Sequence, residues 1–173
     1  GMRERCGKIG SAGKMFGLTG GKVGFLCAAP ALTHSLARAH QFLTFTTPPN
    51  LQSAVAWGLE NSDDWFEAMP LDLERSRQRL TEGLRREGFA VLPSQGTYFL
   101  NLDLPASGVG EADRAFCLRA VKEAGVAAIP VSAFYEDAPV TTIVRLCFSK
   151  RDETLDAGVE RLAKARGLSR VSR

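Results

Sequence analysis

Residues 10–24 read GSAGKMFGLTGGKVG, and this stretch decides how the rest of the chain is interpreted. Lys14 stands there among small residues, with a hydroxyl at Ser11 and a second cation at Lys22. A lone lysine in a loop is usually a solvated surface charge. In a packed loop, however, a lysine amine becomes a nucleophile toward carbonyl carbons, and glycines let the backbone approach a ligand closely. The pattern therefore favours an amine that forms a Schiff base with an aldehyde cofactor, beside a site for that cofactor's phosphate.

A nucleotide-binding P-loop is the main alternative at the same spot, because Gly13-Lys14 could end one. That motif needs a glycine five residues before Gly13 and a serine or threonine directly after the lysine. The chain has Lys8 and Met15 at those two positions. Both requirements fail, so the sequence argues against an ATPase.

Composition sets further limits on the class of protein. The 173 residues are 45% hydrophobic and 24% charged, with a net charge of +3, which is typical of a soluble globular protein. The basic residues are scattered, so we expect no nucleic-acid partner. The longest nearly apolar run, residues 23–32, contains Pro30 and is too short to span a bilayer, so we expect no membrane partner. The N-terminal residues have no apolar core typical of a signal peptide.

The cysteines argue against a metal site. None of the four forms a CxxC motif or lies at ligand spacing from His34 or His40. Small buried hydrophobes with free thiols are the simpler interpretation, and free thiols favour a reducing compartment. We therefore expect a cytoplasmic protein without a bound metal.

Hydrophobic periodicity and turn residues predict alternating strands and helices, hence an α/β or α+β arrangement. The long helix is expected to begin at Pro70 and to end at Gly88, and Asp152 is expected to cap the last helix. The other expected elements, in chain order, are a buried strand 22–28, helices 30–43 and 51–61, strands 89–92 and 97–102, a helix 112–124, strands 126–129 and 142–148, and a helix after 152.

Five segments in order along the chain carry a resemblance to a known family. They are Ser11-x-x-Lys14 with TGGKVG at 19–24, residues 41–52, QGTYF at 95–99, AIPVSAFY at 128–135, and VRLCF at 144–148. As a set they resemble the fold-type I pyridoxal-phosphate aminotransferases of classes I and II. The nearest subgroup is that of the kynurenine, glutamine and methionine aminotransferases. The resemblance covers almost the whole chain.

The resemblance implies an α/β fold, the C-terminal part of the aspartate aminotransferase-like fold of pyridoxal-phosphate transferases. Residues 1–68 would be the end of the large cofactor-binding domain. Residues 69–173 would be the small α+β domain together with its connecting helix. The family's sites lie at a dimer interface, so the resemblance also implies a homodimer.

The resemblance also implies roles for individual residues. Lys14 would hold pyridoxal 5′-phosphate as a Schiff base and then move a proton as a general acid and base. Ser11 and Lys22 would bind the cofactor phosphate, and Arg145 would bind the substrate carboxylate. A position for Arg145 inside an apolar strand supports this independently, because a buried arginine needs an anionic partner. Tyr98 would line the substrate side. The implied reaction moves an amino group from an amino acid to a 2-oxo acid.

Two departures from the family pattern leave alternatives open. Gly21 stands where relatives usually carry a tryptophan, which removes bulk beside the phosphate loop. The family's aspartate for the pyridine nitrogen and its ring-contacting residues lie upstream of the lysine, where this chain has thirteen residues. We therefore expect an incomplete aminotransferase with exposed apolar surface and little activity as an isolated chain. A cysteine-conjugate β-lyase using the same lysine, or a non-catalytic truncated fragment, are the alternatives.

Overall fold

The computed structural model describes residues 2–171. The chain divides into two compact units, Gly1–Ala68 and Met69–Arg173, which we call unit 1 and unit 2. The long helix α4 (Asp63–Arg86) begins in unit 1 and continues into unit 2. Each unit is described by itself.

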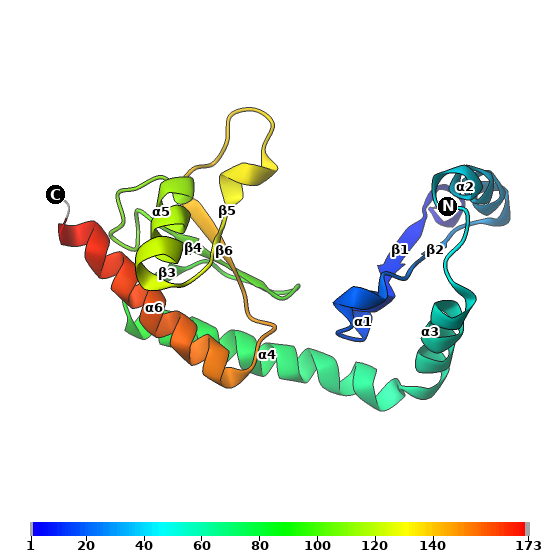
Figure 1. Ribbon diagram of the computed structural model, residues 1–173, viewed down its shortest axis with the longest axis horizontal. Helices are drawn as coiled ribbons and strands as arrows, with labels where there is room; N and C mark the ends of the chain where they lie inside the picture. Colours follow the sequence, from blue (N-terminus) through cyan, green and yellow to red (C-terminus); the bar gives the residue numbers. More distant parts are fainter. Residues whose placement is uncertain (1, 172–173) are drawn as a thin grey trace. The chain divides into compact units, whose positions relative to one another are not determined.

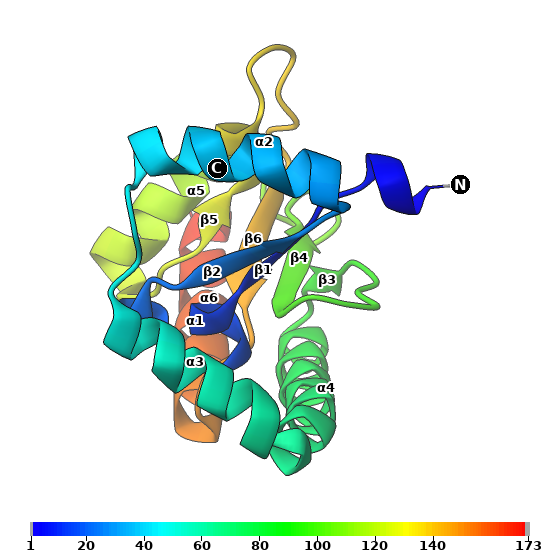
Figure 2. The same cartoon turned by 90° about the vertical axis from the view of Figure 1, so that its right-hand side faces the viewer.

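Unit 1 is built on a two-stranded antiparallel ribbon of β1 (Lys8–Ser11) and β2 (Gly24–Cys27). The chain between the strands forms α1 (Ala12–Met15) and the short 3-10 helix η2 (Thr19–Gly21). Two longer helices follow, α2 (Pro30–Leu43) and α3 (Pro49–Asn61), each with proline in its first turn, where the missing N–H costs nothing. A 3-10 turn, η1 (Arg3–Arg5), precedes the ribbon. In Figures 1 and 2, α1 lies at the end of the ribbon near α3, and α2 lies at the other end.

The sequence prediction of a buried strand at residues 22–28 is wrong about its burial. Strand β2 pairs only with β1 among the described residues, and Leu26 on it is 39% exposed. A strand is buried on both faces only when other elements cover both faces, and a two-stranded ribbon does not supply that cover. Apolar side chains are exposed on the ribbon, where Ile9 is 79% exposed, and around the end of α2, where Phe42, Leu43 and Phe45 are 75–88% exposed. That absent sheet neighbours would cover such surface stays a prediction.

Unit 2 contains a four-stranded antiparallel sheet in the order β3-β4-β6-β5. The strands are β3 (Ala90–Val91), β4 (Phe99–Asp103), β5 (Ile129–Pro130) and β6 (Ile143–Cys147). The helical elements besides α4 are α5 (Asp113–Arg119), which continues as the π-helical turn η3 (Ala120–Ala124), the 3-10 turn η4 (Val131–Phe134), and α6 (Asp152–Val171).

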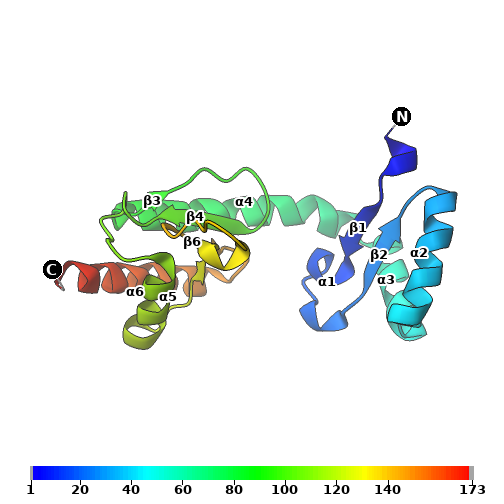
Figure 3. The same cartoon turned by 90° about the horizontal axis from the view of Figure 1, so that it is seen from above.

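Alternation along β4 and β6 gives this sheet two different faces. Leu100 and Leu102 on β4 and Val144 and Leu146 on β6 are at most 7% exposed and join the core. That core also contains buried side chains of α4, α5 and α6, and Figure 3 shows α5 and α6 on the same side of the strands. Since side chains alternate between faces, Arg145 lies on the opposite face, directly across from residues of both neighbouring strands.

Three boundaries differ from expectation. Helix α4 begins at Asp63 rather than Pro70, because acidic residues in the first turn favour the helix N-terminus, and one proline removes a single donor without ending a helix. Asp152 is the first helical residue rather than the cap, and its carboxylate accepts a hydrogen bond from Arg75 at 2.8 Å. Strand β5 lies at 129–130, where Ile129 pairs with Arg145. The predicted stop at Gly88 is confirmed by its left-handed backbone, φ +77°.

Candidate active-site residues

The backbone around Lys14 is fixed by the end of the ribbon. Ser11 ends β1 opposite Gly24, and the Ala12 amide donates to the Val23 carbonyl at 2.9 Å, which closes the loop 12–23. Ser11 and Lys22 are therefore at the same end of the ribbon as α1, which carries Lys14. All three of these polar side chains are exposed, whereas Ala12 beneath them is 2% exposed.

Glycine is required inside this loop by a close backbone approach. A Cβ atom at Gly13 would lie 2.9 Å from the backbone oxygen of Leu18, and a backbone atom cannot give way as a flexible side chain can. Lys22 adopts a left-handed conformation, φ 48° and ψ 38°. That conformation is uncommon for a residue with a β-carbon. It turns the chain so that Val23 reaches Ala12, and the local strain marks a loop held by its surroundings.

Packing beneath the loop explains why it is held. The Phe16 ring lies 5.4 Å from the Phe66 ring and fills the space over Gly58, where a Cβ would meet it at 2.8 Å. The indole N–H of Trp65 donates to the Met15 carbonyl at 2.8 Å. A mostly apolar pocket of about 220 Å³ lies under the loop, lined by Ala12, Gly13 and side chains of α3. The amine of Lys14 thus projects from a rigid, packed segment.

In unit 2, the guanidinium of Arg145 packs against two aromatic rings. It stands on β6 across from Asn101 of β4 and Ile129 of β5. Its guanidinium carbon lies 4.0 Å from the centre of the Phe99 ring and 4.5 Å from that of Phe134. Both distances are in the range of a cation–π contact, which engages the flat surface of a guanidinium and leaves its N–H edge for hydrogen bonding.

One donor of the half-buried Arg145 guanidinium lacks a hydrogen-bond partner. Its Nε atom is buried and has no hydrogen-bond acceptor, and no carboxylate among residues 2–171 forms an ion pair with it. Arg119 shows the contrast, since both oxygens of Glu111 accept from its Nε at 3.0 and 3.1 Å. A planar anion such as a carboxylate would satisfy the open edge of Arg145.

Two further aromatic residues, Tyr98 and Phe134, lie near Phe99 or Arg145. Tyr98 lies just before β4, its partly buried side chain packs against the core, and its ring centre is 4.4 Å from that of Phe99. A substrate role for Tyr98 stays a prediction. The contact of Phe134 with Arg145 is not predictable from the sequence, because no local pattern links these two positions.

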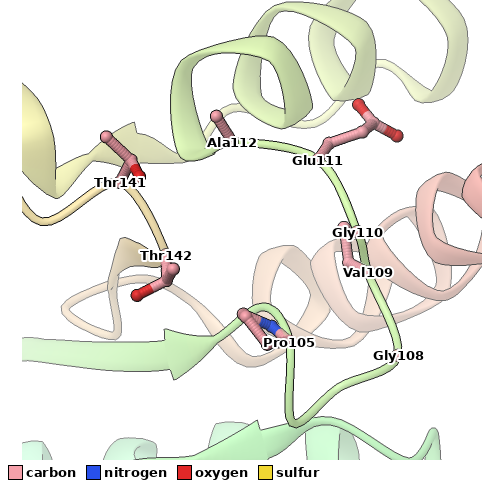
Figure 4. A pocket seen from close by; sticks show the side chains of 8 residues that line it. All are labelled: Pro105, Gly108, Val109, Gly110, Glu111, Ala112, Thr141 and Thr142. Atoms are coloured by element: carbon pink, nitrogen blue, oxygen red, sulfur yellow. The ribbon is translucent and has the colours of Figure 1, made fainter.

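A larger cavity of unit 2, about 510 Å³, contains none of the predicted site residues. Figure 4 shows the segment from Pro105 to Ala112 passing opposite Thr141 and Thr142. Glu111, the charged residue of its lining, pairs with Arg119 at 2.7 Å. The size of this cavity therefore gives no support to any of the predicted site residues of unit 2.

The structure has other features that bear on ligands and location. No cluster of three metal-binding side chains occurs within the described part of the chain. None of the helices within residues 2–171 combines the length and the apolar character needed to cross a bilayer. Cys6, Cys27, Cys117 and Cys147 are all free thiols.

The architecture is that of a pyridoxal-phosphate-dependent aminotransferase. The solved structure of N-succinyldiaminopimelate aminotransferase from Mycobacterium tuberculosis superposes with a TM-score of 0.89 and 42% identity, over 95% of this chain and 43% of that one. In sequence, the methionine aminotransferase of Escherichia coli is 38% identical over 162 residues, which are 93% of this chain and 42% of the relative. Human kynurenine–oxoglutarate transaminase 1 is 34% identical over 184 residues, 95% and 44% of the two chains.

The family model for aminotransferase class I and II matches residues 6–162, and the chain belongs to that family. Class I and II aminotransferases such as these relatives use pyridoxal phosphate. The chain spans less than half the length of the relatives it matches.

The residues present fit this cofactor. Its aldehyde needs a primary amine, and Lys14 supplies one on a fixed backbone. Its phosphate needs hydrogen-bond donors and positive charge, and Ser11 and Lys22 supply both at the same end of the ribbon. The unsatisfied Nε of Arg145 fits the carboxylate that every amino acid substrate carries.

Proposed function

We propose that this chain contributes the cofactor-anchoring lysine and the carboxylate-binding arginine of a transaminase, which moves an amino group from an amino acid to a 2-oxo acid. The observation that carries the proposal is the buried Nε of Arg145, which has no acceptor, on a guanidinium that packs against two aromatic rings. Both the amino acid and the 2-oxo acid bear a carboxylate next to the reacting carbon, so one arginine can orient both. Family membership supplies the reaction class.

Each of the proposed site residues would have a separate role in the reaction. Bound pyridoxal phosphate would supply the electron withdrawal that makes the substrate α-carbon acidic. Lys14 would hold the cofactor covalently and, once released by substrate, would use its amine to remove the proton from the α-carbon. Ser11 and Lys22 would hold the phosphate, Lys22 as a point charge. Arg145 would fix the substrate carboxylate, and the two rings would exclude water from the flat faces of the guanidinium.

The finer features of the function are also proposals. The relatives bear names for different amino acid substrates, so the side-chain preference stays open. No observation favours the β-lyase alternative, which would use the same lysine. We propose a homodimer as the functional state, supported by the family and by the exposed apolar residues of α2; sedimentation velocity tests it. We also propose a cytoplasmic location, which the four free thiols support.

Reductive labelling tests the role of Lys14. The purified chain is incubated with pyridoxal phosphate, reduced with borohydride and digested, and mass spectrometry locates the pyridoxyl group. We expect the label on Lys14 in preference to the other lysines. Ser11→Ala and Lys22→Gln should each raise the cofactor concentration needed for half-maximal labelling, because each removes one phosphate contact.

Lys8 provides the matched control. It is exposed on the same ribbon but pairs with Cys27, at the end away from Ser11. Lys8→Ala should leave the labelling of Lys14 unchanged, whereas Lys14→Ala should abolish the specific label. Equal labelling of all exposed lysines would contradict the proposed role of Lys14.

A further inference from the structure

Asp113 is the most deeply buried carboxylate in the described part of the chain, only 1% exposed, and it lies outside the residues proposed for the reaction. Its Oδ1 accepts from the Arg114 amide at 2.7 Å and from the Ser132 hydroxyl at 2.9 Å, and its Oδ2 accepts from the Ser132 amide at 2.7 Å. A buried carboxylate is tolerated when several donors satisfy it. Such charge-assisted bonds are short and directional, so they fix the group that donates them.

The two bonds from Ser132 join separate parts of unit 2. Asp113 is the first residue of α5, and its own amide donates to the Thr141 carbonyl at 2.8 Å, just before β6. Ser132 is the second residue of the turn η4 (Val131–Phe134). The carboxylate therefore holds that turn against the start of α5 and close to the strand that carries Arg145.

The last residue of the same turn is Phe134, which lies 4.5 Å from the Arg145 guanidinium. Phe134 is 59% exposed, so the core does little to keep its ring in place. The remaining constraint is the backbone of η4, and Ser132 is the residue through which Asp113 holds it. A shift of the turn would uncover one face of the guanidinium and let its N–H edge rotate.

We propose that Asp113 is a positioning residue for carboxylate recognition, holding η4 so that Phe134 lies against Arg145. The inference rests on the proposed role of Arg145 as the carboxylate site. Asp113 itself does not touch the substrate; it acts through Ser132 and Phe134. The orientation of the guanidinium edge on strand β6 is thus set by a buried anion on helix α5.

The test uses the side-chain Nε–H signal of Arg145 in the ¹H–¹⁵N spectrum of the full chain, assigned by its loss in Arg145→Met. A ring stacked on the guanidinium shifts this proton, so the position of the signal reports whether Phe134 is in place. Phe134→Leu gives the reference position without that ring. Titration with pyruvate, a small 2-oxo acid, then measures carboxylate binding at the same atom.

Two variants remove different numbers of the hydrogen bonds that Asp113 accepts. In Asp113→Asn the amide retains only one acceptor oxygen, so some of the three donors lose their partner. Ser132→Ala is milder because it removes only the hydroxyl bond, and it keeps the test decisive if Asp113→Asn folds poorly. We expect both to move the Arg145 signal toward its position in Phe134→Leu and to weaken pyruvate binding about twofold to fivefold, the range expected from losing one cation–π contact.

Asp152→Asn is the matched control, since Asp152 is also the first residue of a helix in unit 2 but pairs with Arg75 on α4. It should leave the Arg145 signal and the pyruvate affinity unchanged. If Asp113→Asn lowers the melting temperature yet leaves both readouts as in the parent, Asp113 is merely structural and the inference is overturned. If the parent signal does not respond to pyruvate, the carboxylate role of Arg145 fails, and the position of the signal in the variants still decides whether Asp113 positions Phe134.

Discussion

Replacing Arg145 with methionine should stabilise unit 2, although arginine substitutions inside folded units usually do the opposite. A buried donor without an acceptor costs about 1–3 kcal/mol, and the Nε of Arg145 is such a donor. Against this stand the contacts with Phe99 and Phe134, each worth about 0.5–1 kcal/mol at a partly exposed site. Methionine recovers part of these, because sulfur–aromatic contacts contribute about 0.3–1.5 kcal/mol. The balance favours the variant by about 1 kcal/mol.

Arg119→Met supplies a control with the same substitution at a paired arginine. Arg119 forms an ion pair with Glu111 at 2.7 Å and donates to the Ala165 carbonyl at 2.9 Å. Removing it leaves both acceptors partly buried and without this donor, which should destabilise unit 2 by about 2–3 kcal/mol. The two variants are therefore expected to change stability in opposite directions.

Hydrogen exchange of the β4 and β6 amides measures both effects within unit 2. If the free energy of unfolding of unit 2 rises by about 1 kcal/mol, amides that exchange only when the unit unfolds should exchange about fivefold more slowly. The melting temperature of a unit of this size should rise by about 4–8 °C. Faster exchange in Arg145→Met, comparable to that in Arg119→Met, would refute the reasoning, because it would mean that Arg145 is paired and structural. If Arg145→Met is more stable than the parent but no longer binds pyruvate, then the arginine lowers the stability of unit 2 and is required for carboxylate recognition.

Two further predictions concern other parts of the chain. Burial raises the pKa of the Cys117 thiol to about 11 from an ordinary value of 9.0, with a smaller contribution from Asp113. Cys117 should therefore react with iodoacetamide far more slowly than exposed Cys6 at pH 8, and equal alkylation rates at the two thiols would contradict this expectation. Because the Cys117 thiol keeps its proton to a higher pH in the folded state than in the unfolded state, the stability that it contributes should be lost as the pH rises from about 9 to 11. Gly13→Ala should weaken the labelling of Lys14 by pyridoxal phosphate several-fold, because its Cβ would meet a backbone oxygen at 2.9 Å, while Gly20→Ala, with nothing within 4 Å, should leave labelling unchanged.

Much of the fold followed from local pattern. The ends of α3 and α4 and the core of β6 were predicted because proline, glycine and periodic apolar residues act within a few positions of where they stand. The prediction for residues 22–28 was wrong about burial because it also relied on local pattern alone. Its apolar residues indicate a strand, but burial depends on which elements cover it, and Leu26 remains 39% exposed.

The sequence by itself determined the family, the lysine loop and the candidates Ser11, Lys14, Lys22 and Arg145. Each of these residues lies in a short segment whose local sequence resembles that of the family. Only the tertiary structure decided how Arg145 is held: by Phe99 across the sheet and by Phe134, which Asp113 fixes from another helix. Those contacts join residues far apart in the chain, and no spacing rule along the chain links them. They form only when the antiparallel register of β4, β6 and β5 brings the residues to one face of the sheet.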